Sequence, residues 1–490
     1  MQPRRLKGEI VAGGKLKSVK AGLVVGAFAA IIGIFASAVP QLARLDAYWG
    51  LKWLQVGLRG ARAAPTEVVI VALDKESASR LGQPAKPHRW DRTLHARLVD
   101  RLADSGARVI AFDVSFTTHR DDAGQDKAFA AAIRRAGNVL LVEQLTPQQG
   151  NGLFYQEKRN PPIPELASAA AGLAPMPLPK TRDRRVDQLW LFKASAGDAA
   201  TLPALAFHQY VLQKTDSMAR LLQAVDPVEA TRLSKAPNHA AYLRQRLASE
   251  PELGERLIQH VQNNPESISD NAAHLVEKLI AMYSGASSRF LDFYGPPHTI
   301  TTVPLYRVLQ QESRTSFEFK DKAVFVGGSE LLADQPDDFN TVFARSDGLD
   351  LAGVEIAATA FANLLEGRSV KPVPRSLATA LFALWCFVFA LVCMSLLRGT
   401  RLVVVAGLAT LITLTLVAGT IFIAYQSFAH DGTWLPLIVP LFVQLPFVIV
   451  AALLWRYHTA RKEQQIIRVA LERILPPDIA ALAIRGQDTT

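Results

Sequence analysis

Three long apolar runs near the end of the chain constrain its fold more than any other feature. They are Leu377–Leu397, Leu402–Tyr425 and Leu435–Trp455, and none contains a charged residue. Each is close to the roughly 20 residues with which a helix crosses the hydrocarbon core of a bilayer. The alternative, three buried helices of a large soluble protein, does not fit so many uncharged residues in so short a segment. The runs therefore predict three transmembrane helices.

A fourth apolar run, Ala21–Val39, follows a basic N-terminal segment. Residues 1–20 contain many lysines and arginines and one acidic residue, Glu9. A secretory signal peptide is an alternative, because Ala36-Ser37-Ala38 has the small residues of a cleavage site. The length of the apolar run favours an uncleaved membrane helix, and both interpretations export the residues that follow. We expect a cytoplasmic segment at 1–20 and a first membrane helix at 21–39.

The charges between the apolar runs predict their orientation. Residues 398–401 contain two arginines and no acid, whereas residues 426–434 contain Asp431 and neither lysine nor arginine. The tail after Trp455 is basic again. Because cytoplasmic loops are enriched in lysine and arginine, this pattern places both termini inside. It leaves residues 43–374 outside the cytoplasm and residues 456–490 within it.

Residues 43–374 have the pattern of an α/β domain. Apolar, β-branched strands alternate with stretches of helical periodicity, which is typical of βαβ units in a mostly parallel sheet. A polar helical layer or insertion is expected over Leu202–Ser284, and a loop rich in proline and glutamine over Gln148–Pro179. The other expected strands are Glu67–Leu73, Arg108–Val114, Asn138–Glu143, Val186–Phe192, Arg289–Phe293 and Lys322–Gly327, and the other expected helices are Asp91–Ser105, Asp126–Ala136 and Gly353–Gly367.

Composition excludes several functions. The net charge is +10, but the basic residues gather beside the apolar runs, which is a topology signal and not that of nucleic-acid binding. Both cysteines, Cys386 and Cys393, lie in the apolar run Leu377–Leu397, so no disulfide supports the exported domain. The early histidines do not have zinc-ligand spacing, and we expect no metal site. Nucleophile and metalloprotease motifs are also missing, so no catalytic residue is assigned.

Two aspartates suggest a ligand site in the exported domain. Asp74 and Asp113 each end a predicted strand, and the carboxyl ends of parallel strands form ligand crevices. Ser77 and Asp126 follow these strands closely enough to join them. The four residues are candidates for binding a small ligand or cation. The alternative is helix capping, in which Asp74 or Ser77 only satisfies the first amides of the next helix.

The order of these segments resembles the CHASE2 domain, an extracytoplasmic sensor domain of bacterial signalling proteins. The resemblance implies a bacterial inner-membrane receptor with a periplasmic domain, surrounded by membrane lipid and bound by an unidentified ligand or protein. It also makes Arg89, within QPAKPHRWDR (Gln83–Arg92), a further ligand-binding candidate. The matching stretches are Val68–Gly82, Leu98–Phe116, Asp183–Phe192, Leu291–Pro297 (LDFYGPP), Lys322–Ser329 and Leu351–Val370.

The basic tail suggests an output. Ile467, Leu471 and Ile474 have the spacing of a helix–helix seam, which predicts a coupling helix and a homodimer. Leu475–Leu482 (LPPDIAAL) resembles the segment that leads into class III nucleotide cyclase domains. That resemblance implies ATP or GTP and Mg²⁺ only for a cyclase domain outside these 490 residues. Two alternatives stay open: the input half of a sensor kinase, and a membrane protein that recruits a cytoplasmic partner.

Overall fold

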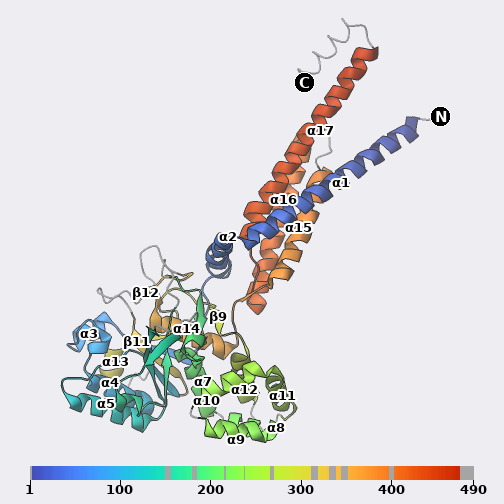
Figure 1. Cartoon of the computed structure of the whole chain (residues 1–490). Helices are drawn as coiled ribbons and strands as arrows, with labels where there is room; N and C mark the ends of the chain where they lie inside the picture. The colour runs from blue at the N-terminus through green and yellow to red at the C-terminus, as the bar shows by residue number, and fades with distance from the viewer. Residues whose placement is uncertain are drawn as a thin grey trace. The chain divides into compact units, whose positions relative to one another are not determined.

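The computed structural model describes most of the chain in two compact units. One unit comprises residues 1–51 with 372–490, and the other residues 52–371 (Figure 1). The described residues are 3–148, 156–178, 185–214, 217–236, 238–264, 270–310, 318–329, 338–343, 351–396 and 402–474.

A mostly parallel sheet forms the centre of the unit 52–371, as the sequence predicts. The strand order is β10-β1-β11-β2-β3, with β5 parallel to β3 and β4 antiparallel to it. Central strands are almost uninterrupted apolar runs because both of their faces are buried. The strands are β1 (Val68–Leu73), β2 (Val109–Asp113), β3 (Val139–Gln148), β4 (Gln156–Asn160), β5 (Gly172–Pro175), β10 (Thr302–Pro304) and β11 (Ala323–Gly328).

Helices cover both faces of this sheet. Ile110 and Phe112 of β2 pack into one core, and Val109 and Ala111 pack into the other, as the alternation of a strand requires. The helices of the first core are α3 (Lys75–Arg80), α4 (Arg92–Asp104), α5 (Ala123–Ala136), α6 (Pro164–Ala167) and α13 (Leu305–Gln310). Those of the second are α7 (Leu202–Lys214), α12 (Asp270–Ser284) and α14 (Gly353–Glu366).

The helical region predicted over Leu202–Ser284 is confirmed. Its first helix, α7, packs against α14, and two of its later helices begin at prolines, Pro227 and Pro251, whose fixed φ suits the first helical turn. Besides α7 and α12, its helices are α8 (Ser217–Val225), α9 (Pro227–Lys235), α10 (His239–Ser249) and α11 (Pro251–Asn263).

The loop expected over Gln148–Pro179 is only partly a loop. It contains β4, α6 and β5. Ala174 of β5 is fully buried beside β3, but this strand is too short to show a period in the sequence. The strand expected over Lys322–Gly327 is confirmed as β11, which extends one residue further, to Gly328. The remaining short elements of this unit are η2 (Trp53–Arg59), η3 (Pro87–Arg89), β6 (Gln188–Trp190), β7 (Phe192–Lys193), η4 (Ala194–Ala196), β8 (Ala199–Ala200), β9 (Ser288–Phe290), β12 (Asp338–Phe339) and β13 (Leu351–Ala352).

Among its described residues, the other unit contains four helices long and apolar enough to span a membrane, which completes the predicted fold class. The spans are Val19–Ala38, Ser376–Met394, Thr410–Asp431 and Val439–Ile466. The helices are α1 (Pro3–Ala38), α15 (Arg375–Leu396), α16 (Leu402–Asp431) and α17 (Leu445–Ile474), with a π-helical turn η6 (Val439–Gln444) before α17. Shorter elements are α2 (Pro40–Leu45), η1 (Asp46–Gly50) and β15 (Thr433–Trp434), and β14 (Lys371–Pro372) lies at the boundary of the units.

Two glycines one helical turn apart bring α1 and α15 together. A Cβ atom added to Gly22 would lie 3.1 Å from the Cα of Leu391, and one added to Gly26 would lie 3.1 Å from the Cα of Phe387. Small residues at four-residue spacing let membrane helices approach to backbone contact, where dispersion replaces the absent hydrophobic driving force. The pair therefore fixes the packing of α1 on α15.

A buried amide joins α1 to the start of the last span. The Gln444 side chain donates from Nε2 to the backbone oxygen of Ala29 at 3.2 Å, and it lies directly over Gly33. The missing side chain at Gly33 leaves the space that the Gln444 amide occupies. Gln444 is 1% exposed, so this polar contact lies inside the helix bundle.

Replacing Gly26 with leucine should separate α1 from α15. The new side chain meets backbone as well as the Phe387 ring, so we expect a loss of about 1–3 kcal/mol in the free energy of unfolding. Gly419→Leu on α16 is the matched control, because no described atom lies within 4 Å of its Cβ position. Unfolding of the full chain in detergent by denaturant measures both. Equal stability of the two variants would contradict the assigned packing.

His95 is the most unusual buried polar residue of the α/β unit. It is fully buried on α4, and its ring lies 5.4 to 5.8 Å from the rings of Phe112, Phe116 and Phe129. Among the described residues neither ring nitrogen has a hydrogen-bond partner. Burial lowers the pKa of His95 to about 3, so the imidazole stays neutral in the folded protein.

This histidine should make the fold sensitive to acid. The unfolded chain binds the His95 proton below a pKa near 6.5 and the folded chain only near 3, so stability falls as the pH drops between these values. The expected loss at pH 5 is about 2 kcal/mol. His95→Phe should abolish that part of the pH dependence, whereas His239→Phe, at an exposed histidine, should not. Denaturant unfolding between pH 7.5 and 5 tests this, and parallel curves for wild type and His95→Phe would refute it.

Candidate functional site

A depression of about 600 Å³ lies beside the carboxyl ends of β2 and β3. Its walls come from the loop between α3 and α4, the loop between β2 and α5, and the extension of β3 beyond the central sheet. Openings at this edge of parallel sheets are common ligand sites. The lining residues are Pro84, His88, Arg89, Ser115, Thr117, Thr118, Arg120 and Gln144.

Arg120 ties two walls of this depression together. Its Nη2 atom donates to the backbone oxygens of His88, at 2.6 Å, and Trp90, at 2.8 Å. The loop it holds is braced further, because the indole of Trp90 donates to the Pro84 oxygen at 2.7 Å. Trp90 itself is fully buried in the core that contains α4 and α5. The depression therefore has a wall of defined conformation.

A buried ion pair holds the loop between β2 and α5, which forms another wall of the depression. Arg92 bridges to the carboxylate of Asp126, and the side chains of the two residues are 1% and 3% exposed. Arg92 also donates to the Thr118 oxygen at 2.5 Å. The other oxygen of Asp126 accepts from the backbone amide of Arg120 at 3.1 Å. Asp126 thus anchors the β2–α5 loop and does not line the depression.

The other predicted ligand residues lie apart from it. Asp74 caps α3, since its Oδ1 accepts from the Ser77 amide at 2.7 Å, and the Ser77 hydroxyl accepts from the Tyr306 amide at 3.2 Å. Asp113 lies on the opposite face of the sheet, where its carboxylate is near Gly353 of α14. The structure therefore does not gather the five candidates, and Arg89 is the member that lines the depression.

A second cluster surrounds Asp292, a residue that the sequence pattern did not single out. Asp292 is 1% exposed and forms ion pairs with three arginines. Arg59 bridges to Oδ1, and Arg62 and Arg368 approach Oδ2 at 3.2 and 3.3 Å. Arg59 and Arg62 follow the first membrane helix in sequence, and Arg368 precedes the second. One carboxylate therefore holds both connecting segments.

Backbone contacts reinforce this Asp292 cluster. The Gln55 side chain donates to the Leu291 oxygen and accepts from the Phe293 amide, both at 3.1 Å. The Asn363 side chain of α14 bonds both the amide and the carbonyl of Asp292 at 2.9 Å. The loop 291–294 is thus fixed to η2 on one side and to α14 on the other.

Glu366 and Tyr294 extend the cluster. Arg62 bridges to Glu366 at 2.8 Å, and its guanidinium lies 3.9 Å from the centre of the Tyr294 ring. Burial raises the pKa of the Tyr294 phenol, so its hydroxyl stays protonated and donates to Glu366 at 2.9 Å. The charges balance to within one unit, with three arginines against two carboxylates.

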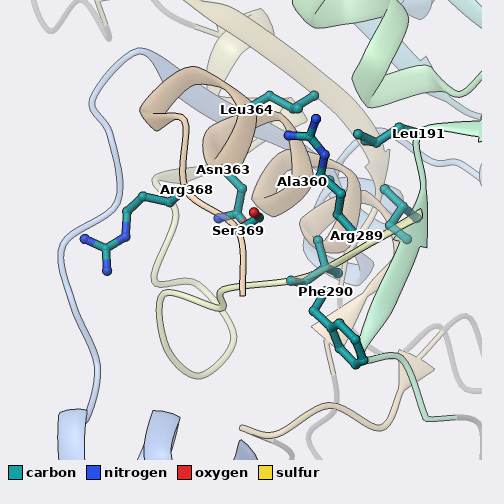
Figure 2. Close-up of a pocket in the computed structure, with 10 residues that line it drawn as sticks. Leu191, Arg289, Phe290, Ala360, Asn363, Leu364, Arg368 and Ser369 are labelled. Carbon is teal, nitrogen blue, oxygen red and sulfur yellow. The ribbon is translucent and has the colours of Figure 1, made fainter. Parts of the chain in front are cut away.

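A narrow crevice lies beside this cluster (Figure 2). Its lining includes Arg289, Asn363 and Leu364, and its free space is about 10 Å³. That is close to the space one water molecule needs. Figure 2 shows Arg368 pointing away from the crevice, in keeping with its ion pair to Asp292. The crevice is a packing gap, and the depression near Arg120 is the better candidate for a ligand.

The predicted coupling residues fall in α17. Ile467, Leu471 and Ile474 belong to this continuous helix, but their side chains lie outside the described part of the chain, as do Leu475–Leu482. In the described residues no group of three or more histidine, cysteine, aspartate or glutamate side chains is placed to hold a metal ion.

Comparison with protein families gives one match. The model of the CHASE2 domain matches residues 26–397, which is well over half of the chain and includes the whole α/β unit with α15. Neither the curated proteins nor the solved structures contain a match. CHASE2 domains are extracytoplasmic sensors, and four apolar helices identify a membrane protein. The chain belongs to the CHASE2 domain family.

Proposed function

We propose that this chain is a bacterial inner-membrane receptor whose periplasmic α/β domain regulates a cytoplasmic class III nucleotide cyclase. The CHASE2 domain supplies signal reception. The proposed topology rests on the charges near the membrane helices, with Arg398 and Arg401 between α15 and α16 and Asp431 at the end of α16. The proposed working form is a homodimer, because class III cyclase sites form between subunits.

The Asp292 cluster is the observation that carries this proposal. A signal received in the α/β unit must pass through the segments that lead to α1 and α15. Both segments bind the same short loop, through Arg59 and Gln55 on one side and Asn363 and Arg368 on the other. A displacement of this loop therefore alters both connections together.

The proposed mechanism is a shift between two packings of the receptor. A ligand changes such an equilibrium only as far as it binds the two states unequally. Packed elements held by discrete ion pairs change in steps and not continuously. The cluster, with three arginines on one carboxylate, suits such a step because exchanging one ion pair for another repositions a whole segment.

α17 is the proposed route to the output. It continues without a break from Leu445 to Ile474, so the apolar span and the basic stretch that contains Arg456 and Arg461 form one rod. A rotation or shift of the span is carried along such a helix. The resemblance of Leu475–Leu482 to the segment before cyclase domains supports a cyclase as the output.

The proposal is tested by cyclic-nucleotide output. The reading frame that contains this chain is expressed in a bacterium without its own cyclases, and cyclic AMP and cyclic GMP are measured for wild type, Asp292→Asn and Asp100→Asn. We expect one nucleotide to accumulate and its amount per receptor to change at least threefold in Asp292→Asn only. A membrane-inserted receptor without nucleotide would contradict the cyclase output. Equal output from all three proteins would contradict control by the α/β domain.

The two substitutions should also differ in their effect on the stability of the protein. Asp292→Asn removes the buried carboxylate that pairs with three arginines, of which Arg62 keeps Glu366, and we expect a loss of about 3–5 kcal/mol in the free energy of unfolding. Asp100→Asn removes a surface pair with Arg135, at 2.8 Å, and should cost below about 1 kcal/mol. Denaturant unfolding of the full chain measures both. A similar small loss in the two variants would show that the Asp292 cluster is not stabilising.

A further inference from the structure

We propose that the depression beside β2 and β3 binds a small molecule through a carboxylate or phosphate group. This inference deepens the receptor role proposed above by naming the chemical class of its ligand. It rests on four features of the described residues: the charge of the lining, the fixed geometry of Arg120, the hydroxyl donors and the absence of acidic side chains from the lining.

The lining carries positive charge. Arg89 and Arg120 belong to it, and of the residues that line it none is acidic. Arg89 is exposed on the η3 turn and forms no ion pair that the described residues show. A guanidinium presents paired N–H groups that match the two oxygens of a carboxylate or phosphate. A divalent cation would meet two like charges here, so an anion is favoured.

Arg120 is preorganised for such a contact. Its two bonds to the oxygens of His88 and Trp90 fix the plane of the guanidinium before a ligand arrives. Its Nε atom is buried and has no hydrogen-bond partner among the described residues. A fixed donor costs little entropy on binding, which is the advantage of a preorganised site.

Hydroxyl groups add neutral donors. Gln144 donates to the Ser115 oxygen at 2.9 Å, so the Ser115 hydroxyl hydrogen remains available to a ligand. Thr117 and Thr118 are exposed on the same loop and line the same depression. These hydroxyls place neutral donors on the wall that the loop between β2 and α5 forms.

The carboxylates near the depression do not line it. Asp126 is buried against Arg92. Asp91 caps α4 by accepting from the Thr93 amide at 2.8 Å, and Asp122 caps α5 by accepting from the Gly124 amide at 2.8 Å. Asp121 is exposed and is not part of the lining. The charged side chains that line the depression are therefore two arginines, with no carboxylate among the lining residues.

Calorimetric titration of the full chain in detergent tests the proposal with defined probes. Inorganic phosphate, succinate and citrate are the anions, and glucose and choline are the neutral and cationic controls. We expect saturable binding of at least one anion, weakened at least tenfold in Arg89→Gln and reduced by added sodium chloride. Arg134→Gln is the matched control, since it removes the same charge from an exposed position on α5 outside the lining.

Three results would overturn the proposal. They are the absence of saturable binding for all three anions, equal affinities in wild type and Arg89→Gln, and binding of glucose or choline that Arg89→Gln weakens as much. Ser115→Ala, which removes a donor without changing charge, should weaken the anion by about threefold to tenfold. The receptor role is judged separately, because cyclic-nucleotide output that responds to Asp292→Asn would stand even if no anion binds.

Discussion

The buried carboxylate of Asp292 is the interaction on which the connection between the α/β domain and its flanking segments depends. A charge at 1% exposure is tolerated only when partners compensate its lost hydration, and here three arginines do so. Those arginines come from both ends of the domain. The ion pairs of one buried carboxylate therefore hold the segment that enters the α/β domain and the segment that leaves it.

In the membrane unit, close helix packing joins the same two parts of the chain. The segments held at Asp292 continue in sequence into α1 and α15, and these two helices pack at backbone distance through Gly22 and Gly26. The entering and leaving chains are thus paired twice, once by ion pairs within the α/β unit and once by close helix packing within the membrane unit. This double pairing is what makes a coupled movement of the two connections physically reasonable.

Patterning of apolar residues was sufficient to predict much of this architecture. The central strands and the four membrane helices are long apolar runs whose period and length are visible in sequence, and both are confirmed. Short elements such as β5 were missed because four residues show no period.

The candidate site was less predictable. Asp74 and Asp113 end two strands of one sheet that β11 separates, yet one caps α3 and the other faces α14. The Asp292 cluster joins residues more than 200 positions apart. The family resemblance covered two of its segments, Leu291–Pro297 and Leu351–Val370, but not their contact.

The most direct test of coupling is a distance between two copies of α17. A spin label at Val469→Cys, which is exposed, is introduced after Cys386 and Cys393 are replaced by alanine, and the receptor is placed in lipid nanodiscs. Pulsed electron paramagnetic resonance then measures the distance between the labels on two copies, once with the native Asp292 and once with Asp292→Asn. If the Asp292 cluster controls the output helix, the distance distribution shifts in Asp292→Asn. An unchanged distribution, or no distance between copies, would contradict the account.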